Sequence, residues 1–134
     1  MNFNQLVLEK LGSLLRKHNF DISQQWNNFL MFKSENLTLI FVHNERENSN
    51  TFFLSGDGKH SLEIGDETLK GFFKSELKLT DTPIDVFVNN LIFFFENEGK
   101  PLLAGDLILL KKLEDFQLQR SHGYTQDLKR RQQK

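Results

Sequence analysis

The sequence predicts an α+β domain: an N-terminal helix, an antiparallel meander of four or five strands, and about three C-terminal helices packed on the sheet. Two changes in apolar spacing support this prediction. Apolar residues repeat at helical spacing in the first 17 residues, alternate along the chain from Phe20 to Leu54, and return to helical spacing after Asp66. The length of 134 residues is close to the commonest size of one domain. We therefore expect a single domain, residues 1–134.

The first helix is predicted over residues 4–17. Val7, Leu11, Leu14 and Leu15 share one side of it, so it is amphipathic and docks on the core. Asn19 is a plausible helix stop. The period then changes to two, and the pairs or triplets that mark the strands are Phe20/Ile22, Leu30/Phe32, Leu37/Leu39/Phe41 and Phe52/Leu54.

The third strand is apolar on both of its faces. Leu37, Leu39 and Phe41 point to one side, and Thr38, Ile40 and Val42 point to the other. A half-buried antiparallel strand is normally polar on its outer face. This strand is therefore either covered on both sides or has a second face that meets a partner.

Two helices are predicted between residues 66 and 99. The first begins at Asp66 and carries Leu69, Phe72, Phe73 and Leu77, after a short Leu62/Ile64 element. The second has Thr82 as N-cap and Pro83 as its first residue, and Gly99 closes it. Val86 and Phe93 project from the side opposite Ile84, so this helix has two apolar faces.

A last helix is predicted over residues 101–119, although residues 107–110 also fit a short strand. Its Leu109, Leu113 and Phe116 need a surface to pack on. We expect that surface to be the preceding helix, so that Phe93 is buried; the alternative is that Phe93 is exposed and meets a partner. Residues 121–123 are expected to break the helix, and the basic tail, about residues 125–134, is expected to fray.

Composition limits the function. The chain has 14 Phe but one Tyr, one Trp and no Cys, so its aromatic area serves packing and dry surfaces. A formal net charge of −1 makes nucleic acid an improbable partner of the domain as a whole. The N-terminus lacks the continuous apolar stretch of a signal peptide, and no run reaches the ~18 residues of a membrane span. We expect a cytoplasmic protein with no membrane partner.

No pattern typical of a catalytic, metal or cofactor site is found. The histidines His18, His43, His60 and His122 are scattered and lack the spacing of metal ligands. His43 near Glu45 and Glu47 fits an acid/base pair less well than a solvated loop. Residues 55–60 lack P-loop spacing, and there is no GxSxG motif. We therefore expect no catalytic residue, no metal ligand and no cofactor.

Surplus apolar surface predicts a protein interface instead. Its residues are Thr38, Ile40 and Val42 on the third strand, Val86 and Phe93 on the helix after Pro83, and a polar rim of Glu45, Arg46 and Glu47. The partner is another protein or a second copy of the chain. The alternative is a small-ligand or enzymatic domain with a Phe-lined pocket that holds His43 or Glu63. Nucleic-acid binding through residues 129–134 is a weaker alternative.

A resemblance adds to this interpretation. The stretch from Leu14 to Phe53, with Lys17-His18-Asn19-Phe20 before short hairpins, resembles small bacterial immunity proteins encoded beside polymorphic toxins. Leu102-Leu103-Ala104-Gly105-Asp106 and Leu113-Glu114-Asp115-Phe116 have the same character. The resemblance lies in segment order and texture. It implies a protein that binds a toxin stoichiometrically, blocks it by occlusion and has no catalytic residues.

Overall fold

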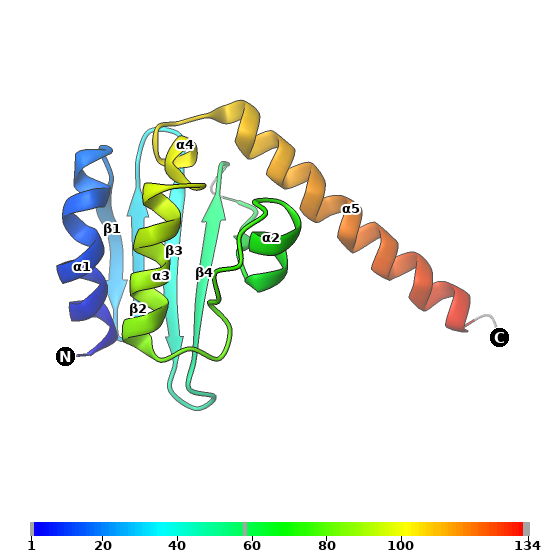
Figure 1. The fold of residues 1–134 in the computed structure, drawn as a ribbon, viewed down its shortest axis with the longest axis horizontal. Helices are drawn as coiled ribbons and strands as arrows, with labels where there is room; N and C mark the ends of the chain where they lie inside the picture. The colour runs from blue at the N-terminus through cyan, green and yellow to red at the C-terminus, as the bar shows by residue number, and fades with distance from the viewer. Residues whose placement is uncertain (1, 58, 133–134) are drawn as a thin grey trace.

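A computed structural model describes residues 2–57 and 59–132, with side chains described up to Arg120. The helices α1 (Phe3–Lys17) and α3 (Ile84–Glu96) lie side by side on one face of a five-stranded sheet (Figure 1). The predicted α+β class is confirmed. The short helix α2 (Asp66–Gly71) lies beside the last strands, and α5 (Leu107–Gln132) extends away from the body.

The sheet is an antiparallel meander in the order β1-β2-β3-β4-β5. Its strands are β1 (Asp21–Trp26), β2 (Phe29–Lys33), β3 (Thr38–Asn44), β4 (Ser49–Ser55) and β5 (Leu62–Glu63). Asn28 and Asn48 take positive φ angles of 61° and 50° in the turns between strands, a conformation that Asn tolerates better than most residues. The edge strand β1 has a register shift between Ile22 and Gln24.

Helix α1 begins with a capping box. The Asn2 side chain accepts from the Gln5 amide at 2.9 Å, and the Gln5 side chain accepts from the Asn2 amide at 3.2 Å. The helix ends before His18, and Asn19 takes a φ of 67°, as a helix stop requires. Its buried side, which includes Val7, Leu11 and Leu15, faces the core.

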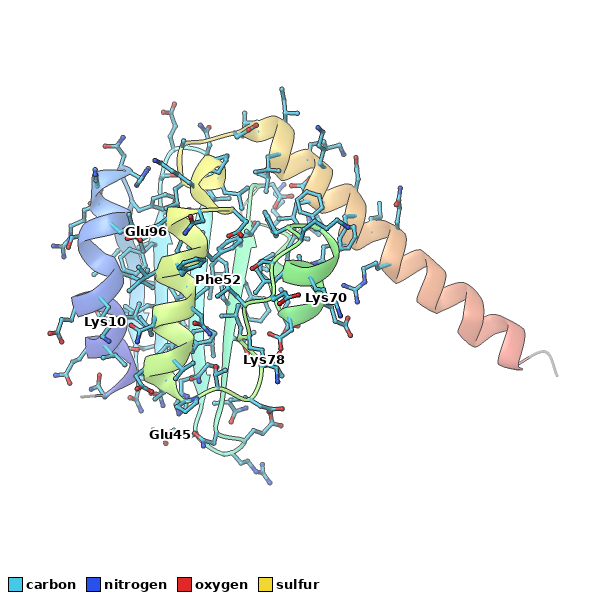
Figure 2. All side chains as sticks on the ribbon, in the orientation of Figure 1. Lys10, Glu45, Phe52, Lys70, Lys78 and Glu96 are labelled. Carbon is cyan, nitrogen blue, oxygen red and sulfur yellow. The ribbon has the colours of Figure 1, made fainter. Side chains whose placement is uncertain are left out.

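Phenylalanine fills the space between sheet and helices. Phe41 and Phe52 stack across β3 and β4 with ring centroids 5.3 Å apart. Phe52, labelled in Figure 2, in turn meets Phe95 of α3 edge to face with ring centroids 5.4 Å apart. Each of these rings is at most 1% exposed. The predicted use of Phe for packing therefore describes this layer well.

The C-terminal half corrects several boundaries. Helix α2 ends at Gly71, so Phe72, Phe73 and Leu77 follow it rather than lie on it. Helix α3 begins at Ile84 with Pro83 as its N-cap residue and without a side-chain cap, and the Thr82 hydroxyl donates to the Leu79 carbonyl. Thr82 is therefore not the N-cap that the sequence predicts.

The predicted helix over residues 101–119 is two helices, α4 (Lys100–Leu103) and α5. Gly105, with a φ of 88°, turns the chain between them. The expected break at residues 121–123 is also wrong, because α5 continues to Gln132. Residues 133–134, at the end of the basic tail, lie outside the described part of the chain.

Candidate functional site: the outer face of the sheet

Among the described helices, α1 and α3 cover one face of the sheet and none covers the other. Side chains that pair across neighbouring strands point to the same face, so the strand register defines each row. Leu30, Phe41 and Phe52 form one core-facing row, and each is fully buried. The residues between such rows point to the opposite side, which we call the outer face.

Two adjacent rows of the outer face are mostly apolar. The first, the Trp26 row, contains Trp26, Phe29, Val42 and Thr51. The second, the Met31 row, contains Gln24, Met31, Ile40, Phe53 and Glu63. Six large apolar side chains are thus contiguous across four strands.

None of these six side chains packs on the core. Phe29, Met31, Ile40, Val42 and Phe53 are half-buried by their own neighbours, and none belongs to the group of partly buried residues that contact the core. Trp26 is 55% exposed, and its ring stacks on Phe29 with centroids 4.2 Å apart. Helices α1 and α3 lie on the other side of the sheet (Figure 1). The outer face is therefore open to solvent.

Polar residues surround the two apolar rows. Gln24 and Glu63 end the Met31 row, and Asp21 and Lys33 lie in the next row beyond it. At the opposite end, Glu45, Arg46 and Glu47 lie in the exposed β3–β4 turn, and Figure 2 labels Glu45 there. Glu45 accepts a hydrogen bond from the Asn28 side chain at 2.9 Å. An apolar centre inside a polar rim is the usual anatomy of a protein interface.

The structure separates the predicted interface residues into two surfaces. Ile40 and Val42 lie in the apolar rows of the outer face, beside the turn of residues 45–47. Thr38 lies in the next row but is only 6% exposed, so it offers little surface. Val86 and Phe93 lie on α3, in the layer on the other side of the sheet. One partner surface cannot cover both sets directly.

Phe93 corrects the expected burial. Its side chain is 53% exposed, because α5 packs on α2 and the β4–β5 loop rather than on the outer side of α3. The Phe116 ring lies 5.5 Å from that of Phe72, and Gln117 donates to the Thr68 hydroxyl at 2.8 Å. Arg120 pairs with Glu67.

Trp26, Phe29, Met31 and Phe53 are interface candidates that the sequence reasoning missed. Residues 29–32 are apolar at every position, as are residues 52–54. The apolar spacing identifies the residues of β2 and β4 that face the core. It gives no role to the apolar residues that alternate with them in the same runs. The signal was the same doubled apolar pattern that drew attention to Ile40 and Val42 on β3.

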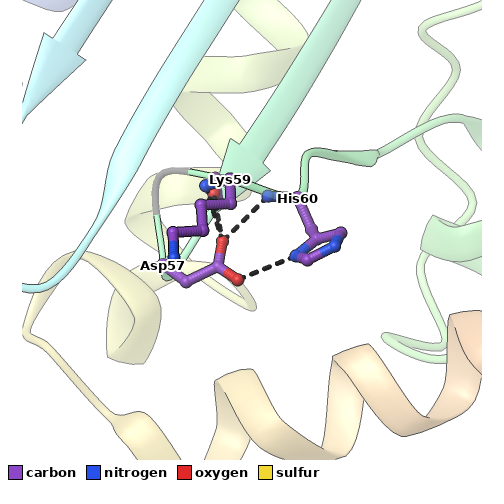
Figure 3. Close-up of polar contacts among 4 residues, drawn as sticks. Asp57, Lys59 and His60 are labelled. Atoms are coloured by element: carbon purple, nitrogen blue, oxygen red, sulfur yellow. Dashed lines mark hydrogen bonds and ion pairs between the residues drawn. The ribbon is translucent and has the colours of Figure 1, made fainter.

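The described residues of the β4–β5 loop do not form a phosphate cradle. The Asp57 carboxylate accepts from the backbone amides of Lys59 and His60, each at 2.8 Å, and contacts the His60 ring at 2.9 Å (Figure 3). An anion would need those amides as free donors. The hydrogen bonds to His60 and Lys59 hold the pKa of Asp57 well below its usual range, and the Asp57 carboxylate raises that of His60.

Two grooves lie beside α5, with volumes of about 630 and 420 Å³. Polar side chains such as Asp66, Gln117 and Arg120 line the first, and neither groove has a phenylalanine or His43 in its described lining. His43 stacks on Phe3 on the core side of the sheet, whereas Glu63 lies on the outer face. Glu63 lines the first groove, whose described lining contains no phenylalanine, and His43 lines neither groove.

No metal cluster or membrane helix is found in the described residues. Within them, His, Asp and Glu side chains do not gather in threes as metal ligands do. Their helices also lack the combined length and apolar content that crossing a membrane requires. Comparison with family models, curated proteins and solved structures finds no match to this chain.

Proposed function

We propose that this chain is a non-enzymatic protein-binding domain that occludes a partner surface with the outer face of its sheet. The observation that carries the proposal is the pair of apolar rows on a face that no described helix covers. Tryptophan, phenylalanine and methionine are enriched at the centres of protein interfaces, and Trp26, Phe29 and Met31 lie together here. The rim charges of Asp21, Lys33, Glu45 and Arg46 would orient the partner.

The resemblance to immunity proteins suggests which kind of partner to test. A toxin encoded beside this chain would be held stoichiometrically, and binding would cover the toxin surface without any reaction on it. The mechanism needs no catalytic residue on this chain. It needs a rigid apolar surface, which a five-stranded sheet backed by two helices supplies.

Affinity capture from native lysate, with neighbouring gene products expressed, tests the proposal. We expect a protein retained stoichiometrically by the wild type and lost from Ile40→Asp, because the substitution would bury an unpaired carboxylate in the interface. Phe93→Ser is the matched control, since it changes an exposed apolar residue on the opposite layer. Equal retention by the wild type and both variants, or no stoichiometric partner, would contradict the proposal.

A further inference from the structure

We infer that a second copy of this chain covers the outer face whenever no other partner does. The inference rests on the proposed function and names the occupant of the same face in the free protein. The reason is that the outer face is apolar and no described helix covers it. A contiguous apolar face that remains uncovered is an aggregation liability, and a closed symmetric pair covers it without leaving an open apolar surface.

The size of the face is appropriate for a dimer. Strands lie about 4.8 Å apart and alternate residues on a strand about 6.8 Å apart, so four strands and four rows cover on the order of 500 Å² in projection. Corrugated side chains expose more accessible area than their projection. A standard interface buries roughly 800 Å² of accessible area on each partner. The outer face with its rim is therefore about as large as one side of such an interface.

The two rows are also complementary to each other. A two-fold axis that lies in the interface and runs across the strands exchanges the Trp26 row with the Met31 row. Phe29 of one copy then packs on Met31 of the other, and Val42 packs on Ile40. The strands of the two sheets remain nearly aligned, which is a common geometry for face-to-face sheet packing.

The rim charges fit the same axis. The same rotation places the Lys33 end of β2 in one copy against the other end of β2 in the second copy. At that other end, the Asn28 side chain donates a hydrogen bond to Glu45. Lys33 of each copy thus faces Glu45 of the other, and opposite charges across a rim favour one orientation. Both residues are exposed in the single chain, so both are available for this contact.

Sedimentation equilibrium of the purified chain tests the inference. We expect a monomer–dimer equilibrium, with the dissociation constant raised at least roughly tenfold by Ile40→Asp, since burying an unpaired carboxylate costs more than a factor of ten in affinity. Phe93→Ser should leave the equilibrium unchanged. Trp26→Gln, at a 55% exposed position, provides a second disrupting variant if circular dichroism shows that Ile40→Asp is unfolded.

The single tryptophan gives an independent signal. Trp26 lies on the outer face, so its emission should shift to the blue and resist acrylamide quenching as protein concentration rises through the dimer range. A chain that stays monomeric with unchanged Trp26 emission overturns the inference. If the chain is monomeric and Ile40→Asp still abolishes capture of a partner protein, the proposed function stands. If the chain dimerises but Ile40→Asp does not reduce capture of a partner protein, the proposed function is overturned and the dimer is not.

Introduced cysteines test the arrangement, because the chain has none of its own. Lys33 and Glu45 lie at opposite ends of one sheet, so the double variant Lys33→Cys/Glu45→Cys cannot close a disulfide within a chain. We expect it to give a covalent dimer on oxidation, in higher yield than either single variant. If Ile40→Asp disrupts the dimer but the double cysteine variant gives no covalent dimer, the two-fold arrangement is overturned.

Discussion

The indole ring of Trp26 and the phenyl ring of Phe29 stack across the β1–β2 hairpin, with centroids 4.2 Å apart and planes inclined by 6°. The pair ties the exposed edge strand β1 to β2 on the outer face. It therefore contributes both to the hairpin and to the apolar surface that we propose as the interface.

The Trp26–Phe29 stack should be measurable as a coupling energy. In a double-mutant cycle of Trp26→Ala and Phe29→Ala, we expect a coupling of about 0.5–1.5 kcal/mol in the free energy of unfolding, as aromatic pairs give beyond their area burial. Urea unfolding followed by circular dichroism at low protein concentration measures it. Additive effects would mean that the rings do not interact in solution.

Phe93 and Phe94 are neighbours on α3 with opposite environments, 53% and 0% exposed. We expect Phe94→Ala to lower the free energy of unfolding by about 3–5 kcal/mol, because it empties a core position. Phe93→Ala should change it by less than about 0.5 kcal/mol. Thermal or urea unfolding of the two variants decides, and similar losses from both would contradict the exposure of Phe93.

Some features of this fold are predictable from the sequence and others are not. The order of helices and strands follows from apolar spacing, and Asn19 ends α1 as predicted. In contrast, whether Phe93 is buried depends on where α5 packs. The apolar stripe of α5, formed by Leu109, Leu113 and Phe116, does not show which surface it packs on. That stripe fits several surfaces equally well.

The helix boundaries show a similar limit. A glycine costs about 1 kcal/mol inside a helix, so Gly123 can be tolerated in α5, whereas Gly105 takes a positive φ and divides α4 from α5. The sequence alone does not distinguish these two glycines. For the candidate site, Ile40 and Val42 were predicted from a doubled apolar pattern. The same pattern on β2 and β4 gave Phe29, Met31 and Phe53 only after the register was known, whereas Trp26 follows two Gln residues on β1 and has no such pattern.

Gly99 and Gly12 offer a second contrast. A Cβ added at Gly99 would lie 2.4 Å from Cε2 of the buried Phe94 ring, whereas one added at Gly12 would have nothing within 4 Å. We expect Gly99→Ala to destabilise the fold by about 1–3 kcal/mol through overpacking. Gly12→Ala, inside α1, should stabilise it by about 0.5–1 kcal/mol. Unfolding curves that shift in the same direction for both variants would contradict this geometry.

The Asp57–His60 pair predicts a pH dependence with a defined sign. Hydrogen bonding to Asp57 raises the pKa of His60 above its ordinary 6.5 in the folded state. The stabilisation is therefore fully present below pH 6.5 and is lost as the pH rises through the folded pKa. The lowered pKa of Asp57 gives the opposite pH dependence. Its contribution to the free energy of unfolding is present above the ordinary pKa of 3.8 and is lost as the pH falls through the pKa of the folded state.

An NMR titration of the His60 ring measures the first of these effects directly. In Asp57→Asn the carboxylate that favours the imidazolium is gone, so the pKa of His60 should fall back toward 6.5. Asp21→Asn is the matched control, because Asp21 lies on β1 at the opposite edge of the sheet from the β4–β5 loop. The side chains of His60 and Asp57 are 84% and 53% exposed, so added salt should weaken the wild-type shift. A pKa of His60 that is the same in the wild type and Asp57→Asn would show that the loop does not hold this contact in solution.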